Sequence, residues 1–240
     1  MIFRFANPLK FQRLIETFQP VTLKLALLLL FIGLFYSFFD SPPDYLQGET
    51  VRIMYVHVPC AWFSLMIYSM MATCGIFSIV FKHALADIII RASAPIGACF
   101  TLATLLTGSI WGKPTWGTWW VWDARLTSEL VLLMIYIGII IINNAYEDKY
   151  KGDKYASILA IIGIANLPII KWSVDWWNTL HQPASISKLS SPSIDGSMLM
   201  PLSIMTFSFF FLFLSMLLVR IKGEIIQRKI DVIRFNKAAL

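Results

Sequence analysis

The chain has 240 residues, of which 58% are hydrophobic and 14% are charged, and its mean hydropathy is +0.69. About 25% of the residues of a soluble domain are charged, so this composition excludes an ordinary water-soluble protein. The net charge of +6 does not indicate a nucleic-acid partner, because the basic residues gather in the tails and in alternate loops, which is typical of membrane topology. We therefore expect one all-α integral membrane domain over residues 1–240, surrounded by membrane lipid.

Six apolar segments approach the length of about 20 residues that crosses a hydrocarbon core. In chain order, we expect spans at about 21–39, 59–81, 88–110, 128–142, 155–170 and 197–219. Pro59 suits the first turn of the second span. The end segments, about 1–20 and 220–240, combine basic residues with regularly spaced apolar ones, and they are predicted to be amphipathic helices at the membrane surface.

An even number of spans places both termini on the same side of the membrane. Assigning the loops alternately gives fifteen Lys and Arg residues on the side of the termini and five on the other. The positive-inside rule therefore predicts that both termini are cytoplasmic, in a multi-pass inner-membrane protein, or face the equivalent compartment of a mitochondrion.

The sequence carries no motif of an independent enzyme, because nucleotide-binding, hydrolase and metalloprotease motifs are all absent. Cys60, Cys74 and Cys99 form neither a CxxC pair nor a CxxCH motif. We expect these cysteines to be packing residues within the spans.

Topology separates the three histidines. His57 precedes the second span at its outer end, and His181 lies in the outer connection between the fifth and sixth spans. His83 follows the second span on the inner side, about a bilayer thickness away. His57 and His181 can therefore face each other across an outer cavity, where imidazole is a good ligand for iron. The alternative for each is a hydrogen-bonded residue at the membrane interface.

Five of the nine tryptophans fall within residues 111–122, in an outer loop expected at about 111–127, and three more lie in the other large outer connection. An interfacial aromatic belt accounts for one or two tryptophans at each span end on both faces, but not for eight on one face. Indoles suit a large planar apolar ligand, basic residues suit its carboxylates, and two histidines suit a central metal. Together these features favour haem.

The segment 116–127, WGTWWVWDARLT, resembles the WWD signature of the haem-handling proteins of cytochrome c maturation. A six-span chain of this length, with one outer histidine on each side of the signature, resembles the CcmC family over its whole length. The resemblance implies that His57 and His181 are the axial ligands of haem b. It also implies a haem platform made of Trp116, Trp119, Trp120, Trp122 and Asp123.

Two charged residues next to the signature have alternative roles. The planar guanidinium of Arg125 suits a haem propionate, or it can pair with Asp123 where the fourth span begins. Glu129 is expected in the first turn of that span, where it would only favour the helix dipole.

The resemblance implies that the protein presents haem at the outer, periplasmic face to the haem chaperone CcmE for c-type cytochrome biogenesis. The ATP-binding-cassette complex CcmAB and the small membrane protein CcmD are the other implied partners. One alternative is a haem transmembrane transporter subunit, although transporters usually keep ionisable sites near the midplane, where the predicted spans carry almost no charge. The other is a b-type electron-transfer cytochrome, which would hold haem between histidines within its spans.

Overall fold

The computed structural model describes residues 8–181, 186 and 194–238. The elements in these ranges are α1 (Pro8–Phe35), the π-helix η2 (Tyr36–Asp40), the 3-10 helix η3 (Glu49–Ile53), α2 (Met54–Phe81), α3 (Ala84–Trp116), α4 (Ala124–Ala145), α5 (Lys149–Gly163), α6 (Asn166–Trp176) and α7 (Gly196–Ala238). Six segments in these ranges are long and apolar enough to cross a membrane. Each contains one predicted span, so the number and order of apolar helical segments are confirmed.

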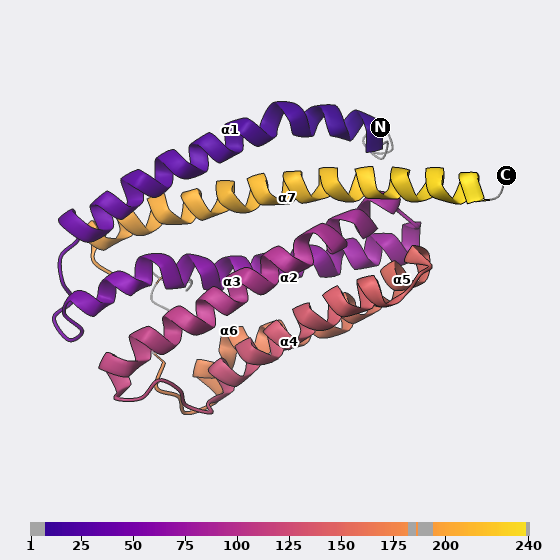
Figure 1. Ribbon diagram of the computed structural model, residues 1–240. Coiled ribbons are helices and arrows are strands. Elements are labelled where there is room, and N and C mark those ends of the chain that lie inside the picture. The colour runs from indigo at the N-terminus through magenta and orange to yellow at the C-terminus, as the bar shows by residue number, and fades with distance from the viewer. Residues whose placement is uncertain (1–7, 182–185, 187–193, 239–240) are drawn as a thin grey trace.

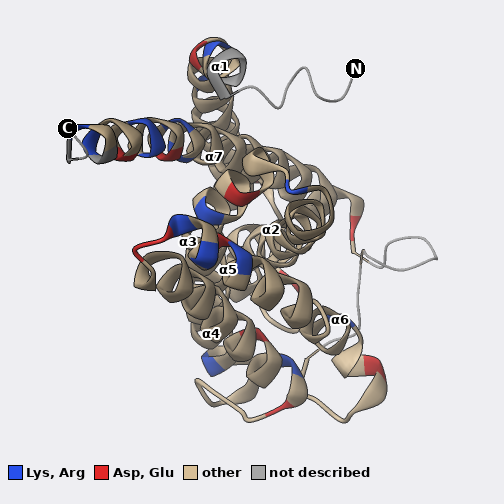
Figure 2. Cartoon of the chain, turned by 90° about the vertical axis from the view of Figure 1, so that its right-hand side faces the viewer, with Lys and Arg blue, Asp and Glu red and all other residues tan. Residues whose placement is uncertain are grey.

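The helices form a bundle in which α1 and α7 lie side by side along one edge, and α2 and α3 separate them from α4, α5 and α6 (Figure 1). The start of α1 and the end of α7 lie at the same end of the bundle, on the right of Figure 1, and the α3–α4 connection lies at the opposite end. Seen along the bundle, α1 stands at the periphery beside α7 (Figure 2).

Both predicted surface helices continue the neighbouring spans in the structure. α1 runs through Pro20 without a break, and α7 extends over 43 residues, which at 1.5 Å per residue is about 64 Å. Tertiary burial explains this continuity, because Ile15, Ile221 and Ile225 are all buried against other helices rather than turned toward a membrane surface. Residues 1–7 and 239–240 of these segments lie outside the described residues.

The second span begins earlier than predicted, and Pro59 lies inside α2 rather than in its first turn. The reason is tertiary: apolar side chains before Pro59 are buried against α7, in a cluster of Val51, Met54, Tyr55, Met198, Leu202 and Met205. His57 therefore belongs to the first turns of α2 and does not precede the helix. Its position in a regular helix makes the direction of its side chain well defined.

The aromatic segment predicted as one loop over 111–127 is helical at both ends. α3 continues to Trp116, and Gly117 ends it with a φ of 78°, a left-handed conformation that glycine adopts easily. The Gly117 N–H donates to the Lys113 carbonyl at 3.1 Å. The loop proper is 117–123, and α4 begins at Ala124. Trp111 and Trp116 are consequently held on a helix.

α4 begins with a side-chain cap, since Asp123 Oδ1 accepts a hydrogen bond from the Leu126 N–H at 2.8 Å. The fifth span consists of α5 and α6, joined by a short turn at residues 164–165. Trp172 and Trp176, which were expected in an outer loop, lie on α6 instead. The Asn166 side chain donates to the Ser128 carbonyl at 2.8 Å and so ties the start of α6 to α4.

Buried charges tie α3, α5 and α7 together at the end of the bundle where α7 finishes. Arg91 and Asp153 are both buried, and Arg91 donates to Asp153 Oδ1 through Nε at 3.2 Å and through Nη2 at 2.8 Å. Arg91 Nη1 also donates to the Asn143 carbonyl at 2.6 Å, and Arg228 of α7 donates to Asp153 Oδ2 at 2.7 Å. One carboxylate therefore serves two guanidinium groups.

Candidate functional site

A cavity of about 150 Å³ lies between α2, α3, α4 and α6, at the end of the bundle that carries the α3–α4 loop. Its lining includes five of the eight predicted site residues, namely His57, His181, Trp116, Trp120 and Arg125. The rest of the lining is mostly apolar, with the polar exceptions including Glu129 and Lys171. The fold therefore brings to one cavity two histidines that are far apart in the sequence.

A threonine on α3 orients His57. The His57 Nδ1 atom lies 3.0 Å from Thr107 Oγ1, and the Thr107 hydroxyl itself donates to the Ala103 carbonyl at 2.6 Å. Because that hydroxyl proton is used, Thr107 acts as the acceptor and His57 carries its proton on Nδ1. The lone pair of His57 is then on Nε2. A Cβ on Gly108 would lie 3.0 Å from His57 Cε1, so the glycine leaves room for this ring.

A carboxylate and a hydroxyl orient His181. Its Nδ1 atom lies 3.0 Å from Asp123 Oδ2, and the Thr179 hydroxyl donates to the same oxygen at 2.5 Å. With Asp123 as the acceptor, His181 is protonated on Nδ1 and carries its lone pair on Nε2, which is the arrangement of a metal-ligating histidine backed by a carboxylate. Asp123 is not part of the cavity lining; it positions His181.

The protonation of this pair also suits a ligand role. Burial lowers the pKa of His181 below its ordinary value, and this effect together with the charge of Arg125 outweighs the opposite influence of Asp123. Burial raises the pKa of Asp123, but the hydrogen bonds from Thr179, from the Leu126 N–H and from His181 outweigh it, so that the pKa is lowered overall. A neutral imidazole beside an ionised carboxylate follows at neutral pH, and metal binding requires a neutral imidazole.

An indole packs edge-on against each imidazole. The ring centroids of Trp116 and His181 are 4.6 Å apart, and those of Trp111 and His57 are 5.6 Å apart. Trp120 lines the cavity, and its indole Nε1 is buried without a hydrogen-bond partner among the described residues.

The other two predicted platform residues, Trp119 and Trp122, are 56% and 77% exposed and do not line the cavity. Trp122 contacts Trp120 with the two ring centroids 5.4 Å apart. Trp122 therefore extends the aromatic surface of Trp120 away from the cavity.

The charged residues are placed differently from the expectation. No ion pair between Arg125 and Asp123 is present in the described part of the chain, and Arg125 lines the cavity instead. Glu129 is not in the first turn of α4 but one turn further along, where it is buried, lines the cavity and accepts a hydrogen bond from Ser64 Oγ at 2.9 Å. The expectation that Glu129 lies in the first turn of this helix is therefore wrong.

Sequence reasoning missed the residues that support the two imidazoles, Thr107 and Thr179, and also missed Glu129 and Lys171 as parts of the lining. Thr179 gave a local signal, because it stands two residues before His181. Glu129 gave a stronger one, since an ionisable residue in an apolar span is a functional candidate by default. Thr107 gave no sequence signal, because its contact with His57 arises from helix packing alone.

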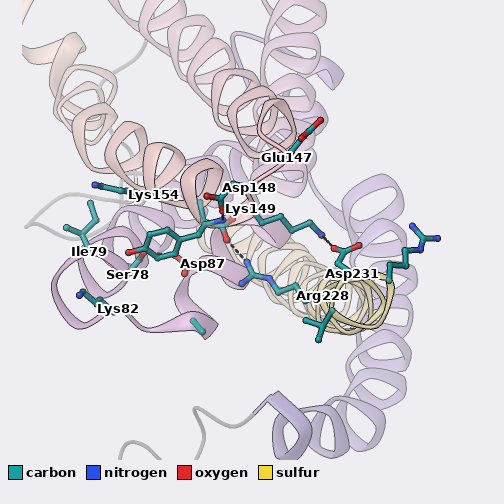
Figure 3. A pocket seen from close by; sticks show the side chains of 15 residues that line it. Ser78, Ile79, Lys82, Asp87, Glu147, Asp148, Lys149, Lys154, Arg228 and Asp231 are labelled. Carbon is teal, nitrogen blue, oxygen red and sulfur yellow. Dashed lines mark hydrogen bonds and ion pairs between the residues drawn. The ribbon is translucent and has the colours of Figure 1, made fainter. Parts of the chain in front are cut away.

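A second, larger cavity of about 1,330 Å³ lies at the opposite end of the bundle, among α2, α3, α5 and α7 (Figure 3). Five basic and five acidic side chains line it. They include Lys149, which pairs with Asp231, and Arg228, which pairs with Asp153. His83 is the residue just before α3 at this end of the helix, and its side chain makes no capping hydrogen bond; it lies far from the cavity that contains His57 and His181. These two pairs use four of the ten charged side chains, and the described residues contain no group of three or more His, Cys, Asp or Glu that could hold a metal ion.

The fold and the site define a multi-span helical membrane protein with two oriented imidazoles, indoles and an arginine around one cavity at one end of the bundle. The family model described as CcmC, Heme exporter protein C, matches residues 1–236. The chain belongs to this family and is a membrane component of cytochrome c biogenesis.

Curated relatives agree with this assignment. The chain is 44% identical over 234 residues to Heme exporter protein C of Bradyrhizobium diazoefficiens, covering 98% of this chain and 89% of the relative. It is 46% identical to the protein of the same name from Haemophilus influenzae, covering 93% and 91%. A putative cytochrome c biosynthesis ccmC-like mitochondrial protein of Marchantia polymorpha is 50% identical over 181 residues, covering 75% of this chain and 76% of the relative.

Proposed function

We propose that this protein binds haem b at the outer, periplasmic face of the inner membrane, with His57 and His181 as the two axial ligands, and delivers it to CcmE for c-type cytochrome biogenesis. One observation carries the proposal. Both imidazoles line the same cavity, and each has its Nδ1 in a hydrogen bond. The lone pair of each ring is then on Nε2, which would be the atom that binds iron. Haem is the cargo of this site and supplies the iron that the two imidazoles would hold.

The tryptophans would cover the apolar porphyrin faces. The cavity of about 150 Å³ is smaller than the pockets of about 300–1,000 Å³ that enclose a small-molecule ligand. Haem would therefore be held only partly inside, against Trp116 and Trp120, with the exposed Trp119 and Trp122 beside the part that remains outside. An indole that covers 100–200 Å² of apolar surface contributes about 2.5–5 kcal/mol before losses. Partial enclosure suits a protein that must release its cargo.

Polar groups in the lining suit the haem propionates. Arg125 offers a planar donor fork, and Lys171 adds a second cation to the cavity lining. The buried indole Nε1 of Trp120 is a further donor that needs an acceptor. We assign Arg125 to a propionate on these grounds.

Two alternative functions remain distinguishable. A haem transmembrane transporter gains some support from the name Heme exporter protein C that the relatives carry, and from Glu129, an ionisable residue buried within a span. The position of His57 inside α2 gives some support to the b-type cytochrome. We favour presentation to CcmE, because His181 lies beyond α6 near the exposed tryptophans. CcmAB and CcmD are the other proposed partners, with ATP hydrolysis supplied by CcmAB because this chain carries no nucleotide-binding motif.

The proposal is tested by the absorption spectrum of the purified protein after haem is added. We expect the bands of a low-spin, six-coordinate iron with two imidazole ligands, and transfer of the haem to purified CcmE. A high-spin spectrum in the wild-type protein would contradict the assignment of the ligands. Low-spin haem that never moves to CcmE would favour the electron-transfer alternative.

The proposed orientation predicts the location of reporter fusions. A cytoplasmic reporter fused after Asn144 should be active, and a periplasmic reporter inserted within residues 188–195 should be active, because the basic residues are concentrated on the side of the termini. The insertion segment lies outside the described residues, apart from 194 and 195. The reverse pattern would place the tryptophans on the inner side and exclude presentation of haem to an external acceptor.

Asp123→Asn should weaken haem binding without unfolding the protein. Asparagine is as good a helix N-cap as aspartate, so the start of α4 is retained, but the amide lacks the charge that supports His181. Loss of such a supporting partner costs about 10–100-fold in metal affinity. The measurement is a haem titration of both proteins in the same detergent, with Glu147→Gln as a control that removes an exposed carboxylate beyond the other end of α4. Equal affinities of Asp123→Asn and the wild type would contradict the positioning role.

A further inference from the structure

The loop between η2 and η3, residues 41–48, reaches the surroundings of His57 through one side chain. Gln47 lies in this loop, and its Oε1 atom accepts a hydrogen bond from the Trp111 indole Nε1 at 2.8 Å. The same indole packs edge-on against His57, with the ring centroids 5.6 Å apart and the ring planes at 76°. Gln47 and Trp111 are 64 positions apart in the chain, so the fold makes this contact. The proposed function gives Gln47 no role.

This loop is held in one conformation around Gln47. The Asp44 Oδ1 atom accepts hydrogen bonds from the backbone N–H groups of Leu46 and Gln47 at 2.9 and 2.8 Å, which is a turn that aspartate side chains favour. The Gln47 carbonyl accepts a hydrogen bond from the Thr50 hydroxyl at 2.7 Å. Gly48 follows with a φ of 57°, and its N–H donates to the Asp44 carbonyl at 2.8 Å. Both backbone polar groups of Gln47 are therefore occupied, and its side chain starts from a fixed point.

Trp111 and Thr107 lie on the same face of α3, because they are four positions apart on one helix. Thr107 Oγ1 lies 3.0 Å from the Nδ1 atom of His57, but a single hydrogen bond leaves the ring free to swing about that atom. An indole against the edge of the ring restricts this motion. Nε1 is the only polar atom of the indole, so the hydrogen bond to Gln47 sets how the indole is turned. The imidazole of His57 is therefore held at two places.

We propose that Gln47 is a positioning residue for His57: its side-chain amide holds the Trp111 indole against the imidazole and so keeps that ring in one orientation at the cavity wall. A residue of a loop thereby orients a proposed iron ligand on α2 without touching it. The inference rests on the proposed function, in which His57 is an axial ligand. Groups around a metal-binding histidine set its orientation and with it the metal affinity.

The first test follows the reactivity of His57 in the purified protein before haem is added. Diethyl pyrocarbonate modifies accessible neutral imidazoles, and peptide mass spectrometry gives the rate at each histidine, with His83, just before the start of α3, as the reference in the same sample. We expect Gln47→Ala to raise the rate at His57 about twofold to tenfold, which is the effect of one lost hydrogen bond on a conformational equilibrium. Gln47→Glu keeps an acceptor oxygen for the indole and should stay near the wild-type rate.

A double-variant comparison tests whether the effect passes through the indole. Trp111→Phe keeps an aromatic ring but removes the N–H group that donates to Gln47, so it should raise the His57 rate by itself. Gln47→Ala should then add little in the Trp111→Phe background, since the interaction is already lost. Tyr45→Ala is the control for the loop, because Tyr45 is 91% exposed, and it should leave the rate at the wild-type value. Equal effects of Gln47→Ala in both backgrounds would overturn the proposal.

Haem-loaded protein separates the inference from the function on which it rests. The electron paramagnetic resonance signal of low-spin ferric haem depends on the orientation of its two imidazole ligands, so Gln47→Ala should keep a low-spin signal but broaden or shift it. An unchanged His57 rate together with an unchanged signal in Gln47→Ala would overturn the positioning role and leave haem binding standing. Wild-type protein without low-spin haem would overturn the proposed function, and a raised His57 rate in Gln47→Ala would then still support the orientation of this ring by Gln47.

Discussion

Alanine at His57 or at His181 is expected to abolish the low-spin spectrum of bound haem and to lower haem affinity by more than about 100-fold. Losing only the supporting partner of a metal-bound histidine lowers metal affinity about 10–100-fold. Removing the histidine removes the bond to the iron itself, so the loss of affinity should be larger. The two substitutions should have similar effects, because both imidazoles line the same cavity and each has its Nδ1 in a hydrogen bond.

The spectral change is more specific than the loss of affinity. Either single variant should retain one imidazole ligand, so any haem that remains should be high-spin and five-coordinate. Free imidazole added to His57→Ala should restore part of the low-spin signal, because it can fill the space that the side chain has left beside Thr107. The measurement is the absorption spectrum and the haem content per protein in detergent.

His83→Ala is the matched control, since it removes the remaining histidine of the chain from the opposite end of α3. It should leave the spectrum and the haem content at their wild-type values. A His83 variant that loses the low-spin bands would contradict the assignment of the ligands. A His57 variant that keeps them would do the same.

Asp153→Ala is expected to produce the largest loss of stability among single substitutions in the described part of the chain. The carboxylate is 4% exposed and pairs with Arg91, which is 7% exposed, and with Arg228. Removing one partner of a buried ion pair costs about 3–5 kcal/mol, because the remaining charge is left buried without a partner. Here Arg91 and Arg228 would both lose this carboxylate, and α5 would lose its ion pairs with α3 and α7.

The measurement is the thermal unfolding midpoint in detergent, together with the amount of protein in the membrane. Asp153→Asn should fall between alanine and the wild type, because the amide oxygen can still accept a hydrogen bond from Arg91. Glu16→Gln is the control for an exposed pair, that with Lys222, and should change the midpoint little. An unchanged midpoint in Asp153→Ala would show that this network does not hold the three helices together. Any folded Asp153→Ala protein should retain low-spin haem if the proposed function holds, since the cavity lined by His57 and His181 is at the other end of the bundle.

The sequence by itself determined the class of this protein. A hydrocarbon core requires about 20 apolar residues for each crossing, and that requirement acts on local segments, so six spans could be predicted from composition alone. The placement of His57 and His181 at one end, with His83 at the other, followed from the parity of the spans. The tryptophan-rich signature identified the family because its residues are contiguous in the chain.

Helix boundaries needed the tertiary structure, because buried contacts between distant segments extend the helices beyond their apolar runs. α2 begins before Pro59 because Met54 and Tyr55 pack against residues of α7. α7 continues past 219 because Ile221 and Ile225 are buried in the core cluster. A local stretch of sequence does not show which distant residues will pack against it.

Only the tertiary structure decided how the candidate site is assembled. Trp116 and Trp120 line the cavity whereas Trp119 and Trp122 are exposed, although all four belong to one signature. Thr107 reaches His57 across 50 positions of the chain, and Asp123 reaches His181 across 58. The physical reason is that residue type and spacing describe the surroundings along one helix, whereas hydrogen bonds to a buried imidazole depend on which faces of different helices meet.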